Sequence, residues 1–346
     1  MVTRKSDFFR FTGQNPAYCP VCFFFVGKMR LNQSLENGNF ARKQNVLLTR
    51  FLKIGILLAV VAALFFTAFF LVSNYKKNHI SVKSIKDAWK VYDYQKVYDL
   101  GHSFLLENPF NNTVLAYYGY ASYYLAQSQT DSRLTQTYLD ESINSLRVAL
   151  FNSSKSLTPQ LQYMLGMAYF YKNSLTSHCY ADLAVKYLTL ARENGYKADD
   201  IPEYLGLSYA SLGLPMDSIS AFTEALLYRE SDSLLLSIAE QYYKAREYSA
   251  AEQYLFRIIK NSENDEIIIK SENLLGNIYI DKEEYDAAMQ EFENVLKKNE
   301  NSADAHYGIG VIYEKQGNIV KARAEWRKTQ KIQVNHAGAL QKLSDN

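Results

Sequence analysis

The side chains able to do chemistry are few and scattered in this 346-residue sequence. Cys19 and Cys22 have the spacing of one half of a structural zinc site, but four ligands are needed and no second pair follows. Cys179 lies beside His178 without the orienting group and oxyanion site that a nucleophile pair requires. The five histidines show no metal-ligand spacing. We therefore expect no catalytic residue, metal or cofactor, and a chain that is not an enzyme.

Composition and charge indicate the class of fold that positions these side chains. A hydrophobic content of 48% is ample for a packed interior, and only 6 Pro and 15 Gly argue against a loop-rich β fold. The net charge of +2 is unevenly distributed, because residues 1–53 hold nine Lys or Arg against Asp7 and Glu36, leaving the remainder at −5. The large C-terminal part therefore has no broad basic face, and nucleic acid is not an expected partner.

Residues 54–72 form an uncharged apolar run. A helix of this length spans about 28 Å, close to the hydrocarbon thickness of a bilayer. Lys53 precedes the run and Lys76 and Lys77 follow it, so the sequence predicts a single transmembrane helix. A cleaved signal peptide is the main alternative, but this run is longer than usual and lacks a small-residue cleavage site.

The residues before this helix form a basic tail, residues 1–53. Met29 offers an alternative start, in which case residues 1–28 are not translated. Basic residues close to the membrane are similar in number on both sides, but the tail as a whole would resist crossing. We expect a single-pass protein with a cytoplasmic N-terminus and an extracytoplasmic C-terminal domain, which is periplasmic if the organism has two membranes.

The clearest pattern lies in residues 269–336, where one motif occurs twice at a spacing of 34 residues. A glycine is followed by an aromatic residue three positions later, then by an alanine and a second aromatic residue. The first copy has Gly276, Tyr279, Ala288 and Phe292, and the second has Gly310, Tyr313, Ala322 and Trp326.

This pattern resembles the tetratricopeptide repeat, which implies an all-α solenoid of antiparallel helix pairs. In such a repeat the small residues lie where the two helices cross, and large residues fill the space between layers. The framework positions implied by the resemblance are Gly166, Gly206, Gly276, Gly310, Ala251, Ala288 and Ala322.

Extending the register backwards predicts about seven repeats in residues 78–336, of which the first three are irregular. Residues 337–346 are expected to form a helix that caps the last apolar face. The predicted repeats are 78–111, 114–156, 158–198, 199–231, 232–268, 269–302 and 303–336.

A concave groove lined by the first helix of each repeat is the expected binding surface. Taking Gly166 and Ala121 as crossing positions directs an aromatic-rich set of side chains into that groove, suited to a peptide or helix of another protein. The alternative is that several of these side chains pack between repeats. The predicted groove residues are Tyr118, Leu125, Tyr163, Met167, Phe170 and Tyr171.

The resemblance implies a protein-binding scaffold without chemistry of its own. We expect a membrane-anchored scaffold in an extracytoplasmic complex for envelope assembly, secretion or folding. The alternative is a structural subunit that self-associates, as a homo-oligomer, through its end repeats.

Overall fold

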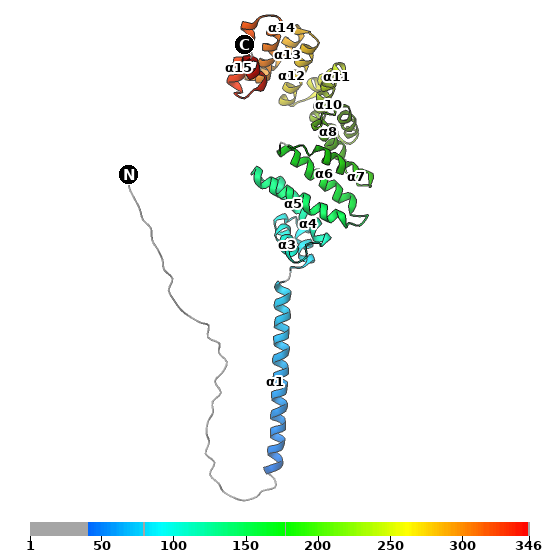
Figure 1. Ribbon diagram of the computed structural model, residues 1–346, viewed down its shortest axis with the longest axis vertical. Coiled ribbons are helices and arrows are strands. Elements are labelled where there is room, and N and C mark those ends of the chain that lie inside the picture. Colours follow the sequence, from blue (N-terminus) through cyan, green and yellow to red (C-terminus); the bar gives the residue numbers. More distant parts are fainter. Residues whose placement is uncertain (1–40, 79, 177, 345–346) are drawn as a thin grey trace, which may run out of the picture. The chain divides into compact units, whose positions relative to one another are not determined.

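The computed structural model describes residues 41–78, 80–176 and 178–344, and every element in these ranges is an α-helix, as predicted (Figure 1). Contacts between residues divide the chain into two units, Met1–Lys77 and Asn78–Asn346. Most of the basic tail, with Cys19, Cys22 and the alternative start at Met29, lies outside the described residues.

In the first unit, α1 (Ala41–Asn78) is a continuous helix of 38 residues. Its segment Leu52–Phe70 is long and apolar enough to cross a bilayer, and none of it is buried against protein. This segment overlaps the predicted transmembrane helix at residues 54–72. A signal sequence near the N-terminus can satisfy the same criteria of length and composition, so membrane spanning stays a prediction.

The second unit is a succession of antiparallel helix pairs, seven of them within the described residues, followed by one last helix. The first helices of successive pairs also contact one another, α4 with α6 and α12 with α14 for example, which stacks the pairs into a solenoid. The pairs are α2 (Val82–Lys90) with α3 (Tyr94–Glu107), α4 (Asn112–Ser128) with α5 (Ser132–Phe151), α6 (Thr158–Leu175) with α7 (Ala181–Glu193), α8 (Ile201–Ser211) with α9 (Pro215–Ala225), α10 (Asp232–Lys244) with α11 (Tyr248–Asn261), α12 (Asp265–Asp281) with α13 (Tyr285–Lys298), and α14 (Ala303–Lys315) with α15 (Ile319–Ile332), and α16 (Ala337–Ser344) follows.

Local sequence explains where several helices begin. Asn111, Ser231 and Ser302 each accept a hydrogen bond from the backbone N–H three residues later, which satisfies a donor that the helix itself leaves free. Pro215 is the first residue of α9, where its missing N–H removes no helical hydrogen bond. The predicted repeat boundary at residue 269 falls inside α12, which begins at Asp265.

The tight turn inside a pair places one residue in the left-handed region. Gly213 and Gly317 have φ of +71° and +79° at this position. Tyr92, Arg246 and Glu283 occupy the equivalent position in other pairs with φ of 58°, 62° and 63°. Since a side chain is disfavoured there, the turn geometry is imposed by the packing of the two helices.

In the last two pairs the helices cross at a glycine of the first helix. A Cβ on Gly276 would lie 2.7 Å from Cζ of Phe292, and a Cβ on Gly308 would lie 2.3 Å from the same atom. The buried ring of Phe292 therefore fills the space between its own repeat and the next. Gly310 makes the equivalent approach to Trp326, with 2.3 Å between a built Cβ and Nε1.

The same contact recurs in earlier pairs. A Cβ on Gly166 would lie 2.7 Å from Cγ of Leu188, and one on Gly206 would lie 2.4 Å from Cδ1 of Phe222. Each of these glycines lies where the facing helix approaches, so the close packing of each pair depends on the missing side chain. The alanines of the second helices are fully buried: Ala251, Ala288 and Ala322.

The last helix, α16, covers the end of the stack. Ala339 is fully buried in a cluster with Trp326 and Ala322, and Leu343 packs against it. Lys342 donates to both carboxylate oxygens of Glu314 at 2.6 and 2.8 Å, which ties α16 to α14. This helix therefore occupies the position predicted for the cap.

Candidate functional site

The predicted groove residues divide into two groups. Tyr118, Leu125 and Met167 are buried, with exposed fractions of 6%, 9% and 4%. They pack in the interior, so the prediction that they face a partner is corrected in favour of the packing alternative. Tyr163, Phe170 and Tyr171 are half-buried and remain accessible.

The correction for Tyr118 and Leu125 has a physical cause in the crossing of α4 with α5. The register predicts Ala121 at this crossing, but Ala121 packs against α2 and α3 in a cluster with Ile85. The residue facing α5 is Gly119, whose Cβ would lie 2.7 Å from Cγ of Leu146. The crossing position is therefore two residues earlier than predicted.

This shift changes which side chains of α4 correspond to those of α6. Counting from Gly119, Tyr123 and Tyr124 occupy the places that Phe170 and Tyr171 hold in the next repeat. Tyr123 and Tyr171 lie 5.8 Å apart between ring centroids, in an edge-to-face arrangement. The early repeats thus place aromatic pairs at the same position on successive first helices.

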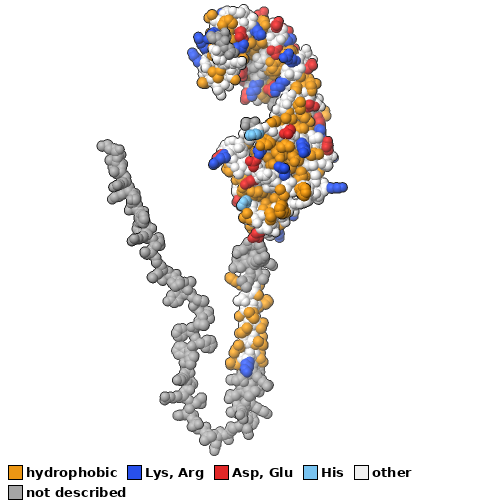
Figure 2. Space-filling view, in the orientation of Figure 1, with side chains coloured by type: hydrophobic (Ala, Val, Ile, Leu, Met, Phe, Trp, Pro, Cys, Tyr) orange, Lys and Arg blue, Asp and Glu red, His pale blue; other side chains and the backbone are white. Residues whose placement is uncertain are grey.

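These side chains belong to a larger surface that we call the aromatic strip. Its members are half-buried aromatic residues of α2, α3, α4, α6, α8 and the loop before α8. On the face seen in Figure 2, hydrophobic side chains form broad patches over the early helix pairs, while charged side chains are frequent over the last pairs. The aromatic strip comprises Trp89, Tyr94, Tyr124, Tyr163, Phe170, Tyr171, Tyr196 and Tyr204.

The first half of the aromatic strip is continuous from α2 to α6. Trp89 lies 5.5 Å from Tyr94 and 6.1 Å from Tyr124, and Tyr94 stacks on Tyr124 at 4.6 Å. Tyr123, buried beneath them, links Tyr124 at 5.4 Å to Tyr171. These offset and edge-on distances are the favourable ones for aromatic pairs, so the rings hold one another in place.

The second half continues to α8. Phe170 contacts Tyr204 edge-on at 4.9 Å, and Tyr163 stacks on Tyr196 at 4.7 Å. The Tyr163 hydroxyl donates a hydrogen bond of 2.7 Å to Oδ2 of Asp200, and the other carboxylate oxygen of Asp200 is buried without a partner among the described residues. The loop before α8 is therefore attached to α6 by both a ring contact and a charge-assisted hydrogen bond.

The hydroxyls of Tyr124, Tyr163 and Tyr204 are held in the neutral form near pH 7. Burial raises the pKa of Tyr124, and the neighbouring Tyr196 phenol adds to the effect. Burial likewise raises the pKa of Tyr163, with contributions from Asp200, and the pKa of Tyr204, with contributions from Tyr171. The surface can therefore offer a partner flat aromatic faces and uncharged hydroxyls.

A pocket of about 430 Å³ opens beside the aromatic strip, where α4 ends, α5 begins and α6 ends. Tyr171, Leu139 and Leu175 supply apolar walls, and Gln127 and Thr135 supply polar ones. Its mixed lining suits an apolar side chain that carries a hydrogen-bonding group.

The later repeats are more polar. Asn273 is 9% exposed, and its Oδ1 atom has no partner among the described residues. Next to it, Glu272 is buried and forms an ion pair with Lys298 of α13. A polar hollow of about 610 Å³ adjoins Asn273, with Lys270 and Asp304 among its walls.

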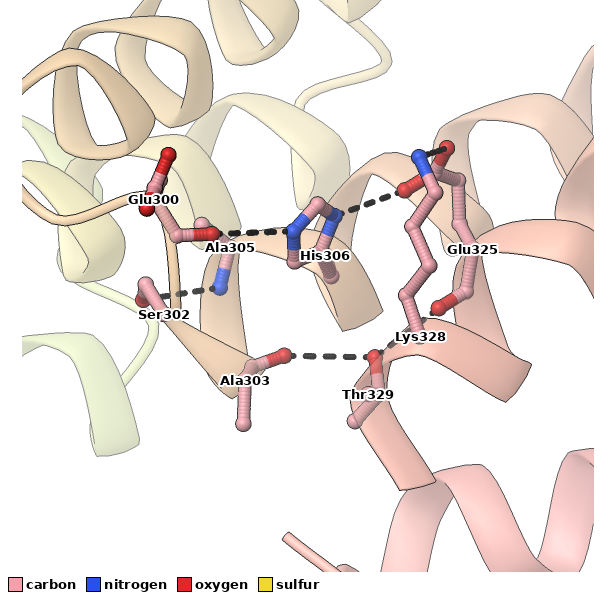
Figure 3. Close-up of polar contacts among 8 residues, drawn as sticks. All are labelled: Glu300, Ser302, Ala303, Ala305, His306, Glu325, Lys328 and Thr329. Atoms are coloured by element: carbon pink, nitrogen blue, oxygen red, sulfur yellow. Dashed lines mark hydrogen bonds and ion pairs between the residues drawn. The ribbon is translucent and has the colours of Figure 1, made fainter. Parts of the chain in front are cut away.

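A polar network at the last pair has the residue types of an active site and the contacts of a structural one (Figure 3). His306 Nδ1 lies 2.7 Å from Oε2 of Glu325, and His306 Nε2 lies 3.3 Å from the backbone oxygen of Glu300. Lys328 pairs with the other oxygen of Glu325, and the Thr329 hydroxyl donates to backbone oxygens. Both ring nitrogens of His306 are thus engaged within the protein, and the network fastens α14 to α15.

Other candidates for chemistry also lack a site in the described ranges. No group of three His, Cys, Asp or Glu side chains there could hold a metal ion. Cys179 is exposed and free in the turn before α7. Gly308 and Gly310 have the Gly-x-Gly spacing of phosphate loops, but Gly308 accommodates the ring of Phe292.

Sequence reasoning missed five members of the aromatic strip: Trp89, Tyr94, Tyr124, Tyr196 and Tyr204. Trp89 is one of two tryptophans in the chain, and it lies in the least regular repeat, where the register is hardest to extend. Tyr196 lies in a loop that no repeat position predicts. A search for aromatic residues outside the regular framework would have found Trp89 and Tyr196.

Comparison with known proteins identifies the repeats. A model of the TPR repeat matches residues 276–317. Tetratricopeptide repeat protein 1 of Schizosaccharomyces pombe (strain 972 / ATCC 24843) is 24% identical over 147 residues, which cover 38% of this chain and 14% of the relative. The chain thus spans a small part of that relative's length.

Solved structures show a similar architecture. The crystal structure of YrrB, a TPR protein with an unusual peptide-binding site, has 21% identity and covers 58% of this chain and 99% of YrrB, with a TM-score of 0.42. A tetratricopeptide repeat protein from Parabacteroides merdae ATCC 43184 has 16% identity and covers 76% of this chain and 96% of its own, with a TM-score of 0.47.

Proposed function

We propose that this chain, which carries tetratricopeptide repeats, is a membrane-anchored scaffold whose aromatic strip binds a segment of a partner protein. The observation that carries the proposal is the gathering of eight half-buried aromatic side chains on the early helix pairs. Tyr and Trp provide large contact areas at low cost in conformational entropy, and they are enriched at the centres of protein interfaces.

The partner segment is a peptide or helix with apolar side chains at regular intervals. The aromatic strip is continuous over several helices, which suits an extended segment of a partner. The pocket beside Tyr171 would hold one side chain of the segment as an anchor. No step of this binding requires a metal, a cofactor or catalysis.

We place the protein in the membrane through α1, with the basic tail in the cytoplasm and the repeats outside it. The length and apolar character of Leu52–Phe70 support the anchor, and the charge of the tail supports the orientation. Such a protein would serve an envelope complex for assembly, secretion or folding. Protease treatment tests the orientation in cells whose outer membrane, if they have one, has been permeabilised while the inner membrane stays intact. A protected repeat unit would then place it in the cytoplasm.

Co-purification from detergent-solubilised membranes tests the binding surface. The variant Phe170→Ala with Tyr204→Ala removes a contacting aromatic pair of the aromatic strip. The matched control is Tyr242→Ala with Tyr254→Ala, a half-buried contacting pair at 5.7 Å on α10 and α11.

We expect the first variant to lose a protein that the unmodified chain and the control retain, while both variants melt at similar temperatures. Retention of every partner by the first variant contradicts the assignment. Unfolding of the first variant is resolved by Tyr204→Phe, which keeps the ring contact and removes only the hydroxyl, which interacts with Tyr171 within the aromatic strip.

A second candidate is self-association through the end of the stack. Val320 and Val334, in and after α15, are 82% and 74% exposed, and Leu340 of the capping helix is 40% exposed. Under this alternative the full chain in detergent is oligomeric by light scattering, and Val320→Ser with Val334→Ser makes it monomeric.

A further inference from the structure

Four helix ends of the first two pairs lie together, on an edge that we call the proximal edge. Ile80 and Val82 pack in the same cluster as Phe104, which places the start of α2 beside the end of α3. The Asn112 side chain donates a hydrogen bond of 2.7 Å to the backbone oxygen of Asn152, which places the start of α4 beside the end of α5. The proximal edge comprises residues 80–83, 104–112 and 148–155.

Large apolar side chains on the proximal edge are unusually exposed. Phe110 and Phe151 are 76% and 87% exposed, and Leu106 and Val148 are 74% and 40% exposed. Single exposed apolar residues are ordinary on protein surfaces, but a group of them at one edge indicates an interaction site. Phe110 is two residues from Asn112 and Phe151 is next to Asn152, so the hydrogen bond between these asparagines brings the two segments that carry the rings side by side.

The chain that leads into this edge is basic. Residues 76–86 contain four lysines and no acidic residue. Lys83 and Lys86 project from α2 as exposed side chains, and Lys155 is exposed in the loop after α5. Aromatic and aliphatic side chains combined with lysines are the composition of segments that lie in the boundary between lipid headgroups and acyl chains.

The covalent connection keeps the proximal edge close to the bilayer if α1 spans it. The apolar run ends at Val72, and the next ten residues, 73–82, lead up to and include Val82, where α2 begins. Six of them continue α1 for about 9 Å, and the last four reach at most about 14 Å when extended. A headgroup layer is about 5–8 Å thick, so the edge lies within reach of the lipid surface.

We propose that the proximal edge docks on an anionic lipid surface, with Phe110 and Phe151 inserted among the headgroups and Lys83 and Lys86 pairing with lipid phosphates. The inference rests on the proposed membrane anchor. It adds a second contact with the bilayer that holds the first repeats against the membrane and leaves the aromatic strip for the partner. A protein that covers the two phenylalanines is the competing occupant.

Depth-dependent fluorescence quenching on the full chain tests this docking. The variants Phe110→Trp and Phe151→Trp are reconstituted into vesicles of anionic phospholipid with or without brominated acyl chains, and the signal of the native tryptophans is subtracted. The control is Val320→Trp, which is equally exposed and lies in the last helix pair. We expect bromine to reduce the fluorescence at positions 110 and 151 and to leave position 320 unchanged.

Charge reversal of the lysines provides a second test of the docking. Lys83→Glu with Lys86→Glu in the Phe110→Trp chain should reduce the quenching, because these exposed lysines no longer attract the lipid phosphates. Equal quenching at positions 110, 151 and 320, or none at any of them, overturns the proposal and leaves a protein as the occupant of the edge.

The membrane anchor is tested separately on the same vesicles. Alkaline carbonate should leave the chain in the membrane. Its release would mean that the proposed anchor has failed, whereas a retained chain without quenching means that only the docking has failed.

Discussion

The contact between Gly276 and Phe292 is a sharp test of how these repeats are packed. A Cβ at residue 276 would meet Cζ, Cε1 and Cε2 of the ring at 2.7, 2.8 and 3.0 Å. The ring is fully buried, and Gly308 blocks its other side at a built-Cβ distance of 2.3 Å. Phe292 therefore cannot move away without displacing the backbone of α14.

Two opposing effects determine the result of Gly276→Ala. Alanine inside a helix is more favourable than glycine by about 1 kcal/mol. Overpacking of a rigid core costs about 1–3 kcal/mol, and the upper part of this range applies because the ring is confined on both sides. We expect the free energy of unfolding to fall by about 1–2 kcal/mol, measured by urea denaturation of the full chain in detergent micelles.

A double-mutant cycle isolates the clash. Phe292→Leu removes the ring atoms that the new Cβ would meet, at the expense of a small cavity. In this background Gly276→Ala should become neutral or stabilising, with a coupling energy of about 1–3 kcal/mol between the two substitutions. Additive effects, or stabilisation by Gly276→Ala alone, would refute the reasoning, because they would mean that the helices have room for a side chain at their crossing.

Three further predictions concern other features of the repeats. Glu283→Gly should raise the unfolding free energy by up to about 1 kcal/mol, because Glu283 has φ of 63° where glycine is favoured. Glu293→Gly, at an exposed position inside α13, is the control and should be destabilising. Tyr163→Phe should lower the unfolding free energy by about 1–3 kcal/mol, because the hydroxyl that donates to Asp200 is lost; an unchanged urea midpoint contradicts this. Burial raises the pKa of Tyr98 to about 12, so the folded state holds this proton more tightly than the unfolded state. The free energy of unfolding should therefore fall as pH rises from about 10 to 12. Unfolding followed by circular dichroism should show a smaller fall for Tyr98→Phe.

Much of the later solenoid could be predicted from the sequence, because its information is local. A glycine and a large residue spaced 16 positions apart, as in Gly276 and Phe292, are enough to specify two helices that cross closely. The apolar run in α1 can also be recognised from the sequence alone, since the length and composition of a helix decide whether it can span a bilayer. The resemblance drawn from residues 269–336 agrees with the TPR repeat matched at residues 276–317.

Tertiary structure decided the details of the candidate site. In α4, Gly119 and Ala121 are both small, and local sequence does not reveal which one meets α5. Only the position of Leu146 on the facing helix selects Gly119, and a shift of two residues turns a helix by more than half a turn. This rotation buries Tyr118, which was predicted to face a partner, and brings Tyr124 into contact with rings that lie far from it along the chain. The physical reason is that each repeat acquires its exposed face only by packing against its neighbours.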